Sequence, residues 1–365
     1  MQRQGKIMFV GAIALVILLG MLVIKSGILG LQPAQDRKLP KEEAALRYPY
    51  QQLSTKEQTL YAALYEAMAA HQTTFTLPYE CTGDEYEKIY LLVRMQEPQF
   101  FYVADTYQMA QIMTEIELQY DETEEEAEPM AEAIERAADE IAAEVAGISD
   151  EGRKFLAIHD AIAERCLYEK SAHSSDIYGC LVEGVAQCEG YSKAFCYVAR
   201  KAGLNVMTIT GKSERGLGHA WNIAEIDGAY YNIDVTWDDE DNYEDAVSHR
   251  CYAMPDARFG GHTAEEPAFK VPQCTEDKEN YYLKYGRILN ESSQMSTKCS
   301  EWALDQTGNN TFIEFYCPTD EIYQAVVSDV RSGSEIKKAI AEYCTKGVFQ
   351  FSKDDRGRIV GILFG

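Results

Sequence analysis

The apolar and polar positions that follow Cys188 repeat with the period of an α-helix. Four apolar residues come 3, 7, 10 and 14 positions after it, namely Tyr191, Phe195, Val198 and Ala202. This spacing places them on one face of a helix. Gly203 then ends the pattern, as glycine often does after a last helical turn. The chain therefore predicts an amphipathic helix whose first turn contains Cys188.

Similar patterns predict most of the other elements. Helical spacing occurs at 55–71, 84–95, 131–145 and 154–166. Short runs that favour strands occur at 73–77, 100–104, 111–118 and 205–210. The end of the chain predicts a strand, two helices and two more strands, at 311–316, 320–330, 334–344, 348–352 and 358–364. This mixture of elements, without an internal repeat, is typical of the α+β class.

Residues 218–239 alternate between apolar and polar positions on either side of Asp227-Gly228. An Asp-Gly pair between two alternating segments is a strong signal for a hairpin with a two-residue turn. Such a turn pairs Ile226 with Ala229 and sets the register of the whole hairpin. A loop of odd length or a bulge would instead place the side chains of His219 and Asp234 on opposite faces of the hairpin.

The register of this hairpin brings a histidine and a carboxylate together. His219 lies opposite Thr236, and Asp234 lies diagonally, two residues away on the same face. Diagonal neighbours are roughly 7–8 Å apart at the backbone, close enough for these side chains to hydrogen-bond. The same alternation places Trp237 on the opposite face.

Cys188 stands between Gly184 and Gly190, where a loop becomes a helix. The positive end of the helix dipole and the free N–H groups of the first turn favour the thiolate, the nucleophilic form. The two glycines would let a substrate backbone come close. A thiolate nucleophile needs a histidine to move protons and an acceptor to orient that histidine. His219 and Asp234 supply these groups, so the sequence predicts a Cys-His-Asp triad.

Two stretches of the chain resemble the transglutaminase-like superfamily, particularly its bacterial membrane-anchored members. They are GVAQCEGYSKAF around Cys188 and GHAWNIAEIDGAYYNIDVTWDD around His219 and Asp234. The resemblance covers roughly residues 150–260 and extends to the order and spacing of the three residues. At positions 186–187 the chain has Ala-Gln, where family members commonly have Gly-Val. The resemblance implies a papain-like core, in which a helix that starts with the cysteine packs on an antiparallel sheet.

The resemblance also implies a role for each residue of the site. Cys188 would be the nucleophile, His219 the general base and acid, and Asp234 the group that orients the imidazole. The Cys188 backbone N–H and the side chains of Tyr178 and Gln187 are candidates for the oxyanion donors. No metal and no other cofactor is implied.

Such a triad would attack an amide carbonyl and form a thioester on Cys188. An amine would resolve the thioester in a transglutaminase, whereas water would resolve it in a peptidase or deamidase. The acidity of the chain favours transfer to amines, because it would concentrate cationic acceptors near the site. The alternative from another class is a non-catalytic surface module that binds a partner such as cell-wall material. A peptide N-glycanase-like enzyme is disfavoured, because the Cys-x-x-Cys zinc pairs usual in that branch are absent.

Composition narrows the range of partners. Of 365 residues, 59 are acidic and 34 basic, which gives a net charge of −25. No basic surface is available to neutralise phosphates, so a nucleic-acid partner is not expected. We expect a protein or peptide substrate, with cell-wall-associated material as a candidate. None of the ten cysteines forms a Cys-x-x-Cys pair, and several of them are predicted to be buried thiols.

Residues 7–24 contain no charged side chain over 18 positions, a length that can just cross a bilayer as a helix. No clear cleavage site follows, so we expect an uncleaved signal anchor, with a cleaved signal peptide as the alternative. The immediate flanking charges favour a single pass through the cell membrane with the catalytic body extracytoplasmic, although the wider count does not. The predicted ranges are signal anchor 1–30, linker 31–45, mostly helical N-terminal α/β region 46–148, transglutaminase-like catalytic domain 149–290 and small C-terminal α+β unit 300–365.

Several other residues have simple structural interpretations. The acidic run at 121–128 is predicted to be the solvated start of a helix. Packing or solvent exposure is expected for His159 and His173, core packing for Trp221 and Trp237, and a solvated strand end for Asp238 and Asp239.

Overall fold

The computed structural model of the protein describes residues 37–108, 110–239, 247–304, 311–332, 335–341 and 349–364. They form two compact units: the first comprises the residues up to Met130 together with 267–269, and the second comprises the rest. The boundary falls inside helix α6 (Glu124–Val145). The predicted span at 7–24 lies outside the described residues. Among the helices that are described, none has both the length and the apolar character needed to cross a bilayer.

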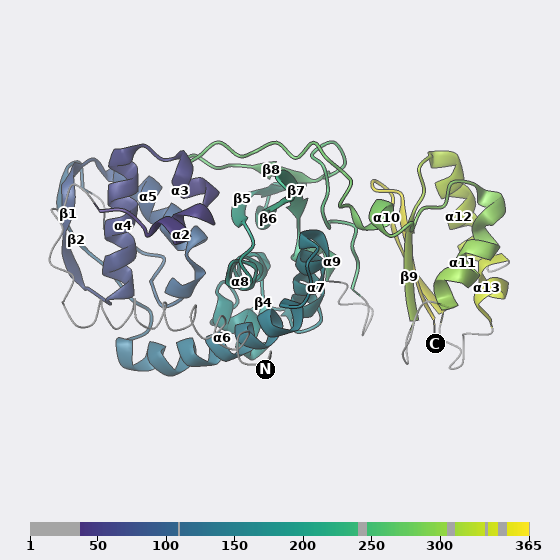
Figure 1. The fold of residues 1–365 in the computed structure, drawn as a ribbon, viewed down its shortest axis with the longest axis horizontal. Coiled ribbons are helices and arrows are strands. Elements are labelled where there is room, and N and C mark those ends of the chain that lie inside the picture. The colour runs from purple at the N-terminus through teal and green to yellow at the C-terminus, as the bar shows by residue number, and fades with distance from the viewer. Residues whose placement is uncertain are drawn as a thin grey trace, which may run out of the picture. The chain divides into compact units, whose positions relative to one another are not determined.

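The first unit combines helices with one antiparallel pair of strands (Figure 1). Its elements are α2 (Lys41–Ala45), α3 (Tyr48–Gln52), α4 (Thr55–Ala69), β1 (Thr74–Cys81), α5 (Gly83–Gln96), the 3₁₀ helix η2 (Pro98–Phe100) and β2 (Met113–Glu117). Reciprocal capping boxes start α4 and α5, in which Ser54 pairs with Glu57 and Thr82 with Glu85. The predictions at 55–71, 73–77, 84–95 and 111–118 are confirmed within a few residues.

The predicted strand at 100–104 is wrong. Pro98 starts η2, because proline suits the first turn of a helix and has no N–H for a strand ladder. The segment that follows contributes one isolated bridge, between Val103 and Tyr120. Its aromatic side chains Phe101 and Tyr102 are buried. The apolar run therefore reflects burial of this segment, without strand geometry.

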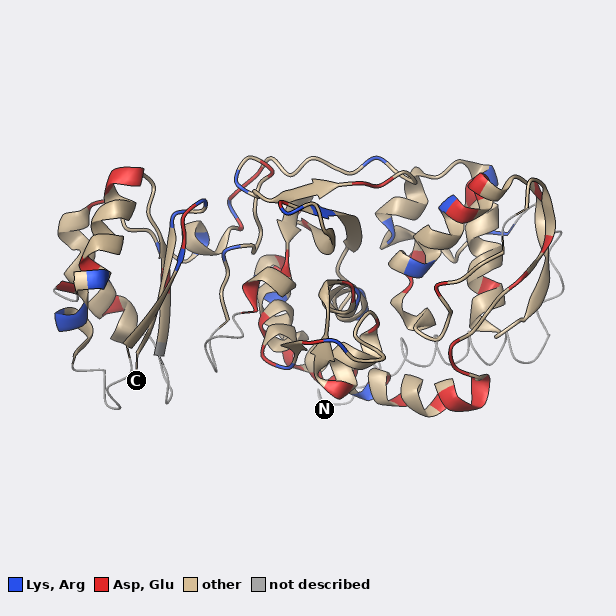
Figure 2. Cartoon of the chain, turned by 180° about the vertical axis from the view of Figure 1, so that it is seen from behind, with Lys and Arg blue, Asp and Glu red and all other residues tan. Residues whose placement is uncertain are grey.

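Acidic and basic residues are interspersed along the described chain (Figure 2). The densest acidic run forms the start of α6, where Glu124, Glu125 and Glu126 are exposed. The Glu126 carboxylate accepts the N–H and the hydroxyl of Thr123, at 3.0 and 2.7 Å, and so caps the first turn. The interpretation of this run as a solvated helix start is confirmed.

A four-stranded antiparallel sheet, in the order β7-β6-β5-β8, forms the centre of the second unit. Its strands are β5 (Val206–Ser213), β6 (Gly218–Ile226), β7 (Ala229–Ile233) and β8 (His262–Ala264). Helix α8 (Cys188–Lys201) packs on β5 and β6, and α7 (Glu151–Ala163) packs on α8 (Figure 1). The predicted α+β class is confirmed. Strand β8 has no counterpart among the predicted elements.

The hairpin of β6 and β7 has the predicted register. Ile226 pairs with Ala229, and the pairing continues to Ile233 at the end of β7. Asp227 and Gly228 have φ values of 50° and 78°, the left-handed conformations that a two-residue turn of this kind requires. The tight turn therefore determines which residues of the two strands face each other.

The predicted pairing of His219 with Thr236 is wrong. Strand β7 ends before Thr236, because helix α9 (Val235–Asp238) follows it directly. Asp234 is the N-cap of α9, and its Oδ1 accepts the N–H of Trp237 at 3.2 Å. Aspartate is a preferred N-cap, and this local preference ends the strand alternation.

The segment before α8 contains two short parallel strands and one π-helical turn. They are β3 (Leu167–Tyr168), η3 (Gly179–Glu183) and β4 (Val185–Ala186). Gly184 has a φ of 72°, which favours glycine where η3 ends. A Cβ on Gly190 would lie 2.6 Å from the carbonyl oxygen of Ser174. Gly190 therefore allows the first turn of α8 to pack closely on this segment, and its expected role in substrate approach has no support in these contacts.

The second unit also contains a small α+β part at its C-terminal end. An antiparallel sheet in the order β10-β11-β9 has helices α11, α12 and α13 on one face (Figure 1). The elements are α10 (Tyr281–Lys284), η4 (Ser292–Gln294), α11 (Met295–Leu304), β9 (Thr311–Tyr316), α12 (Asp320–Ser332), α13 (Glu335–Ile340), β10 (Phe349–Asp354) and β11 (Ile359–Phe364). Buried apolar side chains such as Phe315, Val326 and Ile362 join the sheet to the helices. The predicted order of strands and helices from 311 onward is confirmed.

Candidate active site

Cys188 is the first residue of α8, at the point where the loop enters the helix. The preceding residue, Gln187, is the N-cap and has an extended backbone. The first N–H groups of a helix have no partner within it, so the thiol lies close to free donors. Of the nine cysteines that the structure describes, Cys188 is partly exposed and the other eight are buried. Cys188 is therefore the most exposed cysteine of the described chain.

The structure brings His219 and Asp234 into direct contact. His219 lies near the start of β6, and its Nε2 is 2.7 Å from Oδ2 of Asp234. The side chain of His219 is 6% exposed and that of Asp234 is 0% exposed. The N-cap position of α9, and not a longer strand, holds the carboxylate in this place.

The surroundings shift the pKa of both groups toward their charged forms. Burial lowers the pKa of His219, but hydrogen bonds and charge interactions with Asp234 and Cys188 outweigh it and raise the pKa to about 10. Burial raises the pKa of Asp234, but hydrogen bonds with His219 and His262 bring it well below its ordinary value. Asp234 therefore stabilises the imidazolium that forms when His219 takes a proton from the thiol.

The partners of His219 determine which of its nitrogens can accept a proton. A carboxylate only accepts hydrogen bonds, so Nε2 donates to Asp234. The other nitrogen, Nδ1, is left for the hydrogen bond with Cys188. This arrangement suits a general base that takes the proton of a thiol.

The two side chains among the candidate oxyanion donors lie in different surroundings. The ring of Tyr178 packs edge-on against His173 at 5.2 Å, and its N–H bonds to Asp176 at 2.8 Å. Gln187 directly precedes Cys188, and its Oε1 accepts the hydroxyl of Ser174 at 3.5 Å. Of these two residues, Gln187 is the one directly bonded to Cys188 along the chain.

Tyr168 is a neighbour of the thiol that sequence reasoning missed. Burial and, after it, the charge of Cys188 raise the pKa of Tyr168, while a hydrogen bond with the Gln187 side chain lowers it. Tyr168 is 42% exposed and pairs with Ala186 through the β3–β4 ladder. No motif signals this contact, because each of the two strands is only two residues long.

His262 is a second residue that sequence reasoning missed. Its Nε2 lies 2.9 Å from Oδ2 of Asp234, the oxygen that also binds His219. The three side chains offer donor atoms within 4.8 Å of one another, a set that could hold a zinc ion. Ligand atoms around tetrahedral zinc lie roughly 3.3 Å apart, however, whereas these nitrogens are 2.7 and 2.9 Å from the shared oxygen. The geometry therefore favours two hydrogen bonds.

Trp237 lies beside the site, so its predicted place on the opposite face is wrong. Its ring centroid is 5.4 Å from that of His219 and 4.2 Å from that of His262. The helical backbone of α9 replaces the strand alternation on which the prediction relied. Trp221 is buried as expected, and its ring stacks on His219 at 6.1 Å.

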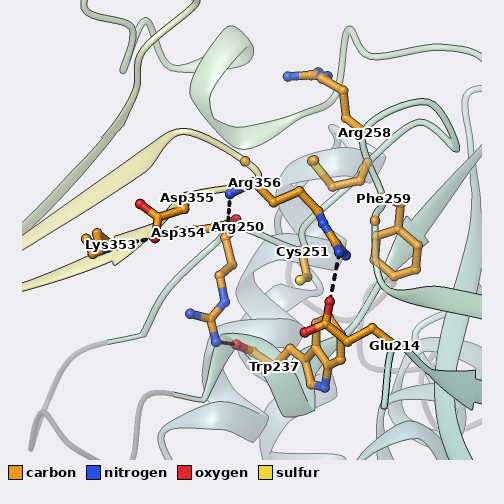
Figure 3. A pocket seen from close by; sticks show the side chains of 13 residues that line it. Glu214, Trp237, Arg250, Cys251, Arg258, Phe259, Lys353, Asp354, Asp355 and Arg356 are labelled. Carbon is orange, nitrogen blue, oxygen red and sulfur yellow. Dashed lines mark hydrogen bonds and ion pairs between the residues drawn. The ribbon is translucent and has the colours of Figure 1, made fainter. Parts of the chain in front are cut away.

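Trp237 also lines a pocket of about 340 Å³ (Figure 3). It is lined in part by the β5–β6 turn and the β10–β11 turn. Arg356 reaches from the second turn to Glu214 in the first, at 2.7 Å. Lys353 pairs with Asp355. These ion pairs within the pocket give no indication of a ligand.

The interpretation of Asp238 as part of a solvated strand end is wrong. Its side chain is fully buried, and its oxygens accept the N–H of Cys251 at 2.9 Å and contact Nε2 of His159 at 3.1 Å. Asp239 accepts a hydrogen bond from the hydroxyl of Tyr191. Both differences have the same cause, because the short helix α9 turns these residues inward. His159 is fully buried, as the packing interpretation allows.

Comparison with known proteins identifies one matching family. Residues 139–235 match the family model described as the transglutaminase-like superfamily. No curated protein matches the chain. A solved structure of a proposed cysteine protease from Cytophaga hutchinsonii aligns at 17% identity over 37% of this chain and 41% of that chain, with a TM-score of 0.27. A solved structure described as a TGase aligns at 18% identity over 39% of this chain and 47% of that chain, with a TM-score of 0.28.

The chain spans less than half the length of either solved structure. The segment that matches the family contains Cys188, His219 and Asp234. The resemblance drawn from the two sequence motifs is confirmed, because residues 139–235 match the model of the transglutaminase-like superfamily.

Proposed function

We propose that the protein is a cysteine-dependent enzyme that transfers the acyl group of a peptide or glutamine amide through a thioester on Cys188. One observation carries the proposal: the buried Asp234 holds His219 by one ring nitrogen and leaves the other for a partly exposed thiol at a helix N-terminus. Helix α8 packed on the sheet that carries His219 is also compatible with a papain-like core.

The first half of the reaction forms the thioester. Nδ1 of His219 takes the proton of Cys188, and the thiolate attacks the carbonyl carbon of the amide. The oxyanion then lies near the N–H groups at the start of α8. His219 passes its proton to the leaving nitrogen, so ammonia or an amine departs and the acyl group stays on sulfur.

The second half releases the acyl group. His219 takes a proton from an incoming amine or water, which attacks the thioester carbon. Collapse of the tetrahedral intermediate breaks the carbon–sulfur bond, and the proton on His219 returns to the thiolate of Cys188. An amine yields a new amide, whereas water yields a carboxylic acid.

We propose transfer to amines over hydrolysis. The net charge of −25 would concentrate cationic amines near the protein, an effect that salt weakens. The test combines the full chain, a glutamine-bearing protein and a labelled primary amine, and follows label incorporation and glutamate formation together. Label incorporation supports transfer. Glutamate or cleaved peptide without label, at high amine and low salt, would favour the hydrolase.

The formation of an acyl-enzyme is the primary test of the function. A pool of glutamine peptides incubated with the full chain should yield an adduct that peptide mapping places on Cys188. Cys188→Ala is the matched control and should yield none. If the wild type forms no adduct and Cys188 reacts with an alkylating agent no faster than the buried Cys274, the non-catalytic binding module becomes the better interpretation.

We further propose a single membrane span at residues 7–24 with the catalytic body outside the cell. The uninterrupted apolar run supports this proposal. Protease added to intact cells should degrade the body of the protein. Full protection in intact cells, with cleavage after lysis, would contradict it.

A further inference from the structure

His262 has no part in the reaction steps proposed above, yet it binds the same carboxylate as His219. We infer that His262 is a positioning residue, whose N–H holds the Asp234 carboxylate in the orientation that directs His219 toward Cys188. This inference rests on the proposed function, because it assigns a role within the same site.

The strand register explains how two distant histidines meet. His219 on β6 pairs with Gly211 on β5, and Gly211 pairs with Ala264 on β8. His262 lies two residues before Ala264, so both histidines belong to the same face of the sheet. A Cβ on Gly211 would lie 2.1 Å from the carbonyl oxygen of Thr263 and 2.9 Å from the ring of Trp221, so glycine allows β8 to pack closely here. The ring centroids of His219 and His262 are 5.3 Å apart as a result.

Both ring nitrogens of His262 contact oxygen atoms, and aromatic rings pack against the imidazole. Its Nδ1 lies 3.1 Å from the carbonyl oxygen of Gly260, and its side chain is 2% exposed. Phe259 stacks on it at 3.8 Å with an interplanar angle of 14°, and Trp237 packs at 4.2 Å. Gly261 has a φ of 86°, and a Cβ there would lie 2.8 Å from the Trp237 ring. This close fit directs Nε2 of His262 at Asp234.

The Asp234 carboxylate depends on these donors because it is buried. Its Oδ1 accepts the N–H of Trp237 at 3.2 Å, and its Oδ2 meets both histidine nitrogens. Without His262, a single donor from outside α9 would hold the carboxylate. Its rotation would then be less restricted, and His219 would lose its fixed direction toward the thiol.

Two substitutions distinguish the hydrogen bond that His262 donates from the packing of its ring. His262→Gln keeps an N–H at the position of Nε2 but loses the aromatic ring, whereas His262→Phe keeps the ring and loses the donor. We expect kcat to fall at least about tenfold in His262→Phe with little change in KM, because a hydrogen bond to a charged group is lost. His262→Gln should recover most of this loss. The opposite order, with His262→Phe the more active variant, would overturn the inference in favour of ring packing.

A measurement on the wild type keeps the inference testable if a variant fails to fold. In full-length protein with ¹⁵N-labelled histidine, the Nε2–H signals of His219 and His262 should both exchange slowly with water, because both side chains are nearly buried. Asp234→Asn should shift or remove both signals. A shift confined to His219 would overturn the inference. The proposed function is tested separately, since it fails when the wild type forms no acyl-enzyme on Cys188, whatever the order of the His262 variants.

Discussion

The second unit holds two largely buried clusters of histidines and carboxylates, and the histidines of the two clusters differ in what their ring nitrogens contact. The cluster that we propose to be catalytic, called the catalytic cluster below, consists of His219, His262 and Asp234, with Cys188 beside it. The closed cluster consists of His159, His249, Asp160, Asp238 and Glu314. Helix α9 connects the two, because Asp234 caps it and Asp238 is its last residue.

In the closed cluster each ring nitrogen faces a carboxylate. His159 contacts Asp160 at 2.9 Å and Asp238 at 3.1 Å. His249 contacts Asp160 at 3.1 Å and also Glu314. Burial lowers the pKa of both histidines, but these partners outweigh it and raise both. Neither ring has a nitrogen left to accept a proton.

The difference indicates what sets His219, the proposed catalytic histidine, apart from the other buried histidines. A histidine–carboxylate contact occurs in both clusters and does not distinguish them. Cys251, whose N–H donates to Asp238, is buried, and burial raises the pKa of its thiol well above the ordinary value. A ring nitrogen that remains available beside an accessible thiol is found in the catalytic cluster. The closed cluster instead joins α7, α9 and the C-terminal strand β9.

The largest effect should come from Asp234→Asn. The amide can donate to Nε2 of His219, which places the ring proton on Nδ1 and prevents uptake of the Cys188 proton. Single-turnover acylation by a glutamine peptide should fall about 10⁴-fold, as for a triad with the wrong tautomer.

Asp238→Asn is the matched control, because the residue is equally buried and on the same short helix. It should change acylation by no more than about threefold below its unfolding temperature, since it touches no reacting group. Near-normal acylation in Asp234→Asn, with loss in Asp238→Asn, would move the orienting role to Asp238.

The second effect concerns stability and should come from the closed cluster. His159→Phe removes both hydrogen bonds of a fully buried ring and leaves Asp238 without its imidazole partner. We expect the free energy of unfolding to fall by about 3–5 kcal/mol, the cost of removing one partner of a buried ion pair. Urea unfolding measures this loss. Alkylation of Cys188 should keep its rate in the folded variant, and a loss as large as that of Asp234→Asn would mean that the clusters are not independent.

The sequence predicts the contact of His219 with Asp234 because both lie on one tight hairpin. The Asp227-Gly228 turn sets the register without help from the rest of the fold. The sequence does not predict the contact of His262 with Asp234, because β8 is three residues long and pairs with a strand far away in sequence. The error at Thr236 arises because a local N-cap competes with the alternating pattern, and the pattern does not show which of them prevails.

The third effect concerns pH and distinguishes His219 from an ordinary histidine. Its pKa is raised from 6.5 to about 10, and the leaving nitrogen needs its proton. Acylation should therefore persist through neutral pH and decline above about pH 10. The stabilisation that protonated His219 gives the fold is complete below pH 6.5 and is lost as pH rises toward 10. A stopped-flow pH profile measures the alkaline limb, and Asp234→Ala should move it toward 6.5. A wild-type limb already near 6.5 would contradict the hydrogen-bonded pair.

The smallest effect concerns the open side of the catalytic cluster, where the substrate carbonyl must lie. Tyr168 hydrogen-bonds with the side chain of Gln187, next to the thiol, whereas Tyr178 packs on His173. Tyr168→Phe removes one hydroxyl from this side and should lower kcat about two- to tenfold with KM nearly unchanged, the value of one neutral hydrogen bond. Tyr178→Phe is the matched control and should leave kcat unchanged. If Tyr178→Phe causes the larger loss, the oxyanion is bound on the side of η3, and the Tyr168 hydroxyl has no part in binding it.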